Sequence, residues 1–176
     1  MREMTPERFG EKFGKAYLND EFYTEDTQVV KDAYAHIAAV NERLYDQIPV
    51  DVIWCENDPY DDYQDMNSRV QEENVLYVFA GGGSPTHMTK EQNIKGRAVH
   101  DWFGHLKHNV NFSIKGEFQK WNHMKDRYND TAQDLLFTEV VGQRCAVSVT
   151  HDFSEVQQRG FLAPQSWIDT AFDVLG

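Results

Sequence analysis

The sequence predicts a mainly helical fold with a minor two-stranded β element, similar in architecture to a helical bundle. Apolar residues recur at three- and four-residue intervals through residues 27–47, which is the pattern of an amphipathic helix. Helix-capping residues mark the starts of other helices. Thr5 can cap a helix that begins at Pro6, and Thr89 has capping-box spacing to Gln92. Only the stretches 50–54 and 75–80 have the character of β-strands.

The 176 residues suit a single domain, 1–176, because the chain contains no internal repeat, low-complexity segment or linker. We expect N-terminal helices over about 5–48 and a short β element over about 50–80. A helical core over about 89–150 carries the motifs, with its last long helix starting at Thr131, and a C-terminal segment spans about 151–176. The glycines at 81–83 predict a flexible connector and a candidate lid.

The composition favours a soluble globular protein and disfavours nucleic-acid binding. The net charge is −12, from 29 acidic and 17 basic residues, so the surface repels phosphate backbones. Cys55 and Cys145 have no paired spacing and suit a reducing cytoplasm. Residues 1–6 lack an apolar leader core, and the longest apolar run, 75–80, is too short to cross a bilayer. We therefore expect a cytoplasmic protein without a membrane partner.

Potential ligands gather among apolar and aromatic neighbours between residues 97 and 143. They are His100, Asp101, His105, Glu117, His123, Glu139 and Gln143. In α-helices, Asp101 and His105 would share one face, and Glu139 and Gln143 another, because each pair is four residues apart. Glu117 and His123 are six apart and would not share a face.

This set predicts a divalent metal site, with zinc, iron or manganese as the candidate ions. Imidazole nitrogens and carboxylate oxygens are their usual ligands, and helical bundles build such sites from inward-facing side chains. The expected ligands are Asp101, His105, Glu117, His123 and Glu139. The alternative is that each polar group is separately hydrogen-bonded. Glu139 argues against it, because an unpaired carboxylate among leucines and valines would be costly to bury.

The motifs also resemble a known family. They are Asp58-Pro-Tyr60, Asp65-Met66, Val75–Phe79, Arg97-Ala-Val-His-Asp101, Gly104-His105, Gly116-Glu117, His123, Thr138-Glu139, Gly142-Gln143 and Phe161–Pro164. Together they resemble a domain of tailed bacteriophages that occurs within large polyvalent proteins and as stand-alone proteins. The resemblance covers about residues 27–167 and implies phage origin, a place in the host cytoplasm and association with the virion as a further option. It implies a shared polar site but no particular reaction.

Three functions remain open from the sequence. In a metal-dependent hydrolase, His100, Asp101 and Glu139 would be catalytic, and Arg97, Arg144 and Gln143 would bind substrate. The His-Asp-x-x-Gly-His string is similar to HD-type phosphohydrolases, although their earlier partner histidine is not evident, and His100 and His105 are one residue too far apart for a zincin. A non-haem iron or di-iron oxygenase is the second alternative. It ranks lower, because the sequence lacks the paired Glu-x-x-His motif that would favour it. The third is a non-enzymatic phage protein with a structural metal or buried polar network.

Overall fold

The computed structural model describes residues 4–19 and 27–176 and confirms the mainly helical fold class with a small β element. The expectation that residues 1–6 lack an apolar leader core falls partly on residues 1–3, which lie outside the described residues. Helix α1 spans Pro6–Leu18 and α2 spans Gln28–Tyr45. Both begin as expected, since the Thr5 and Thr27 hydroxyls accept bonds from backbone N–H groups three residues on.

The β element is a β-α-β unit and not a hairpin. Strand β1 (Asp51–Cys55) pairs in parallel with β2 (Val75–Phe79), in a register that places Asp51 opposite Val75. Helix α3 (Tyr63–Glu73) makes the crossover and is capped by Asp62, whose side chain accepts a hydrogen bond from the Asp65 N–H. On β1, Trp54 remains 43% exposed.

The motif-bearing helices each change their winding partway along. Helix α4 (Lys90–Val99) starts with the expected capping box and continues into a π-helical segment η1 (His100–His105) and a 3₁₀ turn η2 (Leu106–His108). Helix α5 (Ile114–Met124) ends in the 3₁₀ turn η3 (Lys125–Arg127). Helix α6 (Asp130–Phe137) continues through a second π-helical segment, η4 (Thr138–Gly142), into α7 (Gln143–Thr150). Asn129, and not Thr131, caps α6.

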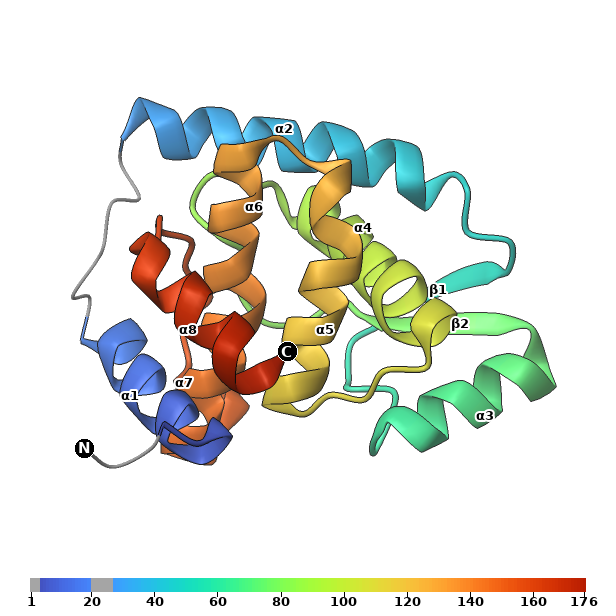
Figure 1. Ribbon diagram of the computed structural model, residues 1–176. Helices are drawn as coiled ribbons and strands as arrows, with labels where there is room; N and C mark the ends of the chain where they lie inside the picture. Colours follow the sequence, from blue (N-terminus) through green and yellow to red (C-terminus); the bar gives the residue numbers. More distant parts are fainter. Residues whose placement is uncertain (1–3, 20–26) are drawn as a thin grey trace.

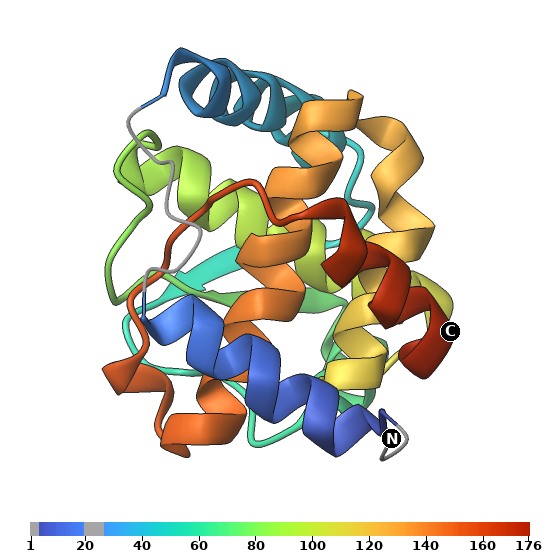
Figure 2. The same cartoon turned by 60° about the vertical axis from the view of Figure 1, so that its left-hand side comes forward.

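Two helical layers enclose the motif segments (Figures 1 and 2). Helix α1 packs against α7 and against α8 (Gln165–Leu175), which follows the 3₁₀ turn η5 (Phe153–Glu155). Aromatic residues from α1, α5 and α6 fill the core between them, including Phe13, Phe118 and Phe137. Helix α2 lies across α4 and α6 (Figure 1). As a result, η1, α5 and η4 meet in the interior.

No helix in the described ranges, 4–19 and 27–176, combines the length and apolar character needed to span a membrane.

Candidate metal centre

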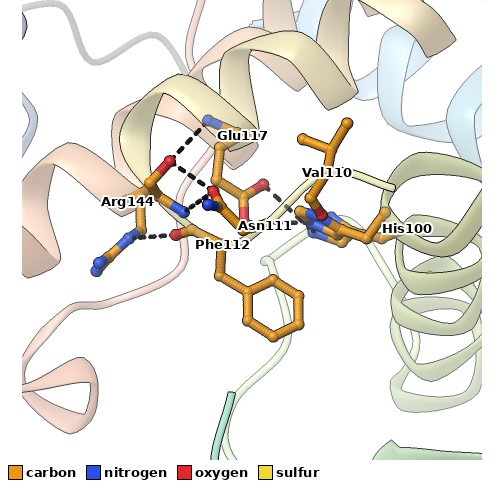
Figure 3. A network of polar contacts seen from close by, with 9 residues as sticks. His100, Val110, Asn111, Phe112, Glu117 and Arg144 are labelled. Carbon is orange, nitrogen blue, oxygen red and sulfur yellow. Dashed lines mark hydrogen bonds and ion pairs between the residues drawn. The ribbon is translucent and has the colours of Figure 1, made fainter. Parts of the chain in front are cut away.

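Three potential ligand atoms converge between η1 and α5. The Nε2 atoms of His100 and His105 are 2.8 Å apart, and each lies 3.3 Å from a different carboxylate oxygen of Glu117. Figure 3 shows the Glu117 carboxylate pointing from α5 toward the His100 imidazole. These three residues form the group of potential metal ligands found in the described part of the chain.

The π-helical winding of η1 explains why His100 joins this group. The Leu106 N–H bonds to the Asp101 carbonyl, five residues earlier, so residues five apart come to lie one above the other. The imidazoles of His100 and His105 therefore face each other, with ring centroids 4.7 Å apart. The expectation that Asp101 and His105 share a face assumed an α-helix and needs correction for this reason.

The tautomer of His105 is set by the backbone. Its Nδ1 lies 2.8 Å from the Val110 carbonyl oxygen, to which it can only donate. In the neutral ring, the proton is then on Nδ1 and the lone pair of Nε2 faces the other two donor atoms. A histidine that ligates a metal commonly donates its second ring N–H to a backbone carbonyl or a carboxylate in this way. The fully buried His105 is thus oriented as a ligand.

Glu117 supplies a carboxylate that the protein leaves incompletely satisfied. Its side chain is only 9% exposed, and its Oε2 atom is buried without a hydrogen-bond partner in the described structure. A buried carboxylate oxygen without a partner is costly. Burial by itself would raise the pKa of Glu117, but the facing imidazoles of His100 and His105 more than offset this and lower it. A cation between the three groups would satisfy the carboxylate.

The distances fit a bound ion. Nitrogen and oxygen ligands lie about 2.0–2.2 Å from zinc, so ligands of one ion are separated from each other by roughly 3.0–3.5 Å. The two Nε2 atoms are 2.8 Å apart, each lies 3.3 Å from its own carboxylate oxygen, and one ligand atom from each of the three residues lies within 4.8 Å of the other two. The side chain of His100 is 28% exposed, which leaves one side of the group accessible from solvent.

Two further ionisable groups lie close to the three ligands. Burial raises the pKa of Asp101 to about 7, although the nearby His105 opposes the shift. Burial lowers the pKa of Lys120 to about 8, against the opposing charges of Glu117 and Asp101. Burial and the Lys120 charge lower the pKa of His100 to about 4. Burial by itself would lower the pKa of His105, but the charge and hydrogen bond of Glu117, together with the charge of Asp101, more than offset this and raise it.

Lys120 was not expected at the site, because a lysine on a helix is normally on the surface. It is buried, with 5% exposure, and its aliphatic stem runs against Gly104 of η1. A Cβ atom at position 104 would lie 2.3 Å from the Lys120 Cγ, so only glycine leaves room for it. The available sequence signal was the one-turn spacing from Glu117 along α5.

Glu139 lies in a separate polar network on η4. One carboxylate oxygen accepts a short hydrogen bond from the Tyr34 hydroxyl, and the other accepts from Gln158 Nε2 at 3.0 Å. Gln158 continues to Asn93, whose amide donates to the Gly83 carbonyl at 3.3 Å. Of the residues that the structure describes, Glu139 is not in the converging ligand group. Tyr34 and Gln158 had no distinctive sequence signal.

The other expected site residues lie apart from the ligand group. His123 is exposed on the outer side of α5 and stacks on His108 with ring centroids 4.2 Å apart, as its spacing from Glu117 predicts. Arg97 donates to the carbonyls of Phe79 and Gly81 at 2.8 Å, and so holds the glycine connector in place.

On α7, Arg144 donates from Nε to the Phe112 carbonyl at 2.8 Å (Figure 3). Gln143 is half-buried at the start of the same helix. Both arginines expected to bind substrate therefore use their guanidinium groups to hold backbone segments.

Comparisons with known protein families, with curated proteins and with solved structures found no match.

Proposed function

We propose that this protein is a divalent-metal-dependent hydrolase whose ion is held by His100, His105 and Glu117. The observation that carries the proposal is the buried Glu117 carboxylate, whose Oε2 atom has no hydrogen-bond partner in the described structure and whose two oxygens each face one imidazole nitrogen, Oε2 that of His100 and Oε1 that of His105. A separately hydrogen-bonded network would not leave that oxygen unsatisfied. Zinc, iron and manganese all accept this ligand set.

The number of ligands favours catalysis over a purely structural ion. Structural zinc sites are normally closed by four protein ligands, whereas catalytic sites have three and keep a position for water or substrate. The partly exposed His100 lies where such a position would open to solvent. A bound ion of this kind supplies a hydroxide at neutral pH by lowering the pKa of its water.

Asp101 is the candidate general base. Its neighbours His105 and Glu117 place it beside the ligand group, and its pKa of about 7 is suited to exchanging protons near neutral pH. Asp101 was expected as both a ligand and a catalytic residue, and the proposal keeps only the second role. Glu139, expected in both roles too, is assigned to the network with Tyr34 and Gln158.

The test is elemental analysis of protein purified without a metal-affinity tag, beside two matched histidine variants. We expect a near-stoichiometric divalent ion in the wild type and in His123→Ala, because His123 is exposed away from the ligands. In His100→Ala the ion should be lost. Equal metal content in both variants, or none in the wild type after supplementation, would contradict the proposed site.

A non-haem iron oxygenase is the second candidate. Two histidines and one carboxylate with open positions are also the ligand set of non-haem Fe(II) oxygenases. Iron in the protein purified under anaerobic conditions, followed by oxygen consumption, would favour this candidate, whereas zinc or manganese would favour hydrolysis.

Phage origin remains part of the proposal and rests on the resemblance of the motifs alone. The cytoplasm of an infected host is the compartment it suggests. The acidic composition, with a net charge of −12, supports the expectation that nucleic acid is not a partner.

A further inference from the structure

We infer that strand β1 is an interface at which two copies of this chain pair in antiparallel orientation, so that their two-stranded sheets join into one sheet. The inference concerns the surface formed by β1 and does not depend on the proposed metal site. It rests on the backbone edge of β1, on its exposed side chains and on the order of residues along the strand.

The outer edge of β2 is protected by side chains of the same chain. The Tyr77 N–H donates to the Tyr60 hydroxyl at 2.8 Å. The Phe79 carbonyl accepts a hydrogen bond from Arg97 Nη1, also at 2.8 Å. Backbone groups on this side of the sheet therefore have partners, which prevents a further strand from pairing there.

The outer edge of β1 has no such protection. The Ala80 N–H donates to the Cys55 carbonyl, so the backbone groups of Cys55 face β2 (Figure 1). Because this direction alternates along a strand, the groups of Ile53 also face β2, and those of Val52 and Trp54 face away from it. In the part of the chain that the structure describes, these outward groups make no hydrogen bond. Such an edge is a template for another strand.

The apolar side chains of β1 are exposed on both faces of the sheet. Ile53 is 45% exposed and Trp54 is 43% exposed, and as adjacent residues of a strand they point to opposite faces. A helix packed on one face would leave the other residue in water. A strand added at the edge places side chains beside both residues, because its own side chains alternate in the same way.

The order of residues in β1 fits a second copy of the same strand. In an antiparallel pair centred on Ile53, that residue lies opposite its own copy, and Val52 lies opposite Trp54. Each pair of Val52 with Trp54 can then exchange hydrogen bonds through the backbone groups that face outward. The charged residue of the strand, Asp51, lies opposite the Cys55 thiol and not opposite a carboxylate. This matters because each chain carries a net charge of −12, which opposes association.

The neighbouring symmetric registers fit less well. A pair centred on Trp54 would place Val52 opposite Glu56, and a pair centred on Val52 would place Ile53 opposite Asp51. Each of these registers sets an apolar side chain against a carboxylate. The register centred on Ile53 is the one that pairs apolar residues with each other on both faces.

The first experiment measures molecular mass by sedimentation equilibrium over a wide range of protein concentrations. We expect the mass of the wild type to rise with concentration from the 20.5 kDa of one chain to twice that value. Ile53→Lys sets like charges opposite each other in place of an apolar pair, so association should be at least about tenfold weaker. Phe153→Lys is the matched control, because it changes a residue that is 58% exposed on η5, and it should associate like the wild type.

Circular dichroism shows whether each variant is folded, and Trp54→Lys replaces Ile53→Lys if the first variant does not fold. A mass of one chain at every concentration of the wild type would overturn the inference. A dimer that forms equally well in the folded lysine variant of β1 would overturn it too, because the interface would then lie elsewhere.

The second experiment tests the register by disulfide cross-linking in a Cys55→Ser background. In the proposed register the two copies of Ile53 form a pair without backbone hydrogen bonds between them, with Cα atoms about 4.5 Å apart, which is within the range of a disulfide. Ile53→Cys should therefore give a covalent dimer on mild oxidation. Asp51→Cys should not, because it lies opposite position 55 of the other copy. Equal cross-linking of the two variants, or none in either, would overturn the proposed pairing.

Discussion

The two π-helical segments, η1 and η4, both place acidic or imidazole groups in the interior. They differ in whether the carboxylate beside them is fully hydrogen-bonded. Segment η1 presents His100 and His105 to Glu117, where a buried carboxylate oxygen has no hydrogen-bond partner in the described structure. Segment η4 presents Glu139 to Tyr34 and Gln158, which donate to both of its oxygens. The same change of helical winding thus occurs both in a group of side chains that could hold a metal ion and in a hydrogen-bonded network.

The largest expected effect is on metal affinity, which should depend on the carboxylate of Glu117 and not on that of Glu139. Changing an outer partner of a metal ligand typically costs 10- to 100-fold in affinity, so Glu117→Gln, which alters a proposed ligand, should cost more than about 100-fold. Glu139→Gln, the matched control on η4, should change the affinity little. Competition with a chromogenic chelator measures both. Similar losses in the two variants would show that Glu139 belongs with the ligands after all.

The next effect is on the free energy of unfolding, which should depend more on Glu139 than on Glu117. Glu139→Ala would leave the hydroxyl of the buried Tyr34 and the amide of Gln158 without their acceptor, and should lower the free energy of unfolding by about 1–3 kcal/mol. Urea unfolding of the metal-free protein measures it. In that state, and at a pH above the raised pKa of His105 where its charge pair with Glu117 is absent, Glu117→Gln should destabilise less, because its Oε2 has no hydrogen bond to lose. The reverse order would contradict the difference between the segments.

The smallest effect is a pH dependence of metal binding. The pKa of His105 is raised above its usual 6.5 by Glu117, so near neutral pH a proton occupies the ring that must become a ligand. Affinity should fall as the pH drops below this raised pKa, by up to about tenfold per pH unit for one displaced proton. Calorimetric titration of the protein with metal, repeated in buffers of different ionisation enthalpy, gives the number of protons released on binding.

Stability of the metal-free protein should change in the opposite direction. The raised pKa of His105 means that its contribution is present below pH 6.5 and is lost as the pH rises through the folded pKa. The lowered pKa of Glu117 means that its contribution is present above 4.5 and is lost as the pH falls through the folded pKa. The pair therefore stabilises the apo protein most between these limits. Stability that does not fall on either side of that range would indicate that His105 and Glu117 are not coupled.

The sequence by itself determined where most of the helices begin and which chemical types lie between residues 97 and 143. Thr5, Thr27, Asp62 and Thr89 begin helices because their side-chain oxygens accept backbone N–H groups close in the chain, an interaction that needs no distant partner. Likewise, the concentration of histidines and carboxylates between residues 97 and 143 indicated a polar site inside a helical fold.

Only the tertiary structure decided which of those groups meet. The α-helical repeat paired Asp101 with His105, but the π-helical winding of η1 pairs His100 with His105. Helix α5 then brings Glu117 to them, while α2 and the C-terminal segment bring Tyr34 and Gln158 to Glu139. These choices depend on packing between elements distant in the chain, and a local hydrophobic pattern carries no information about them.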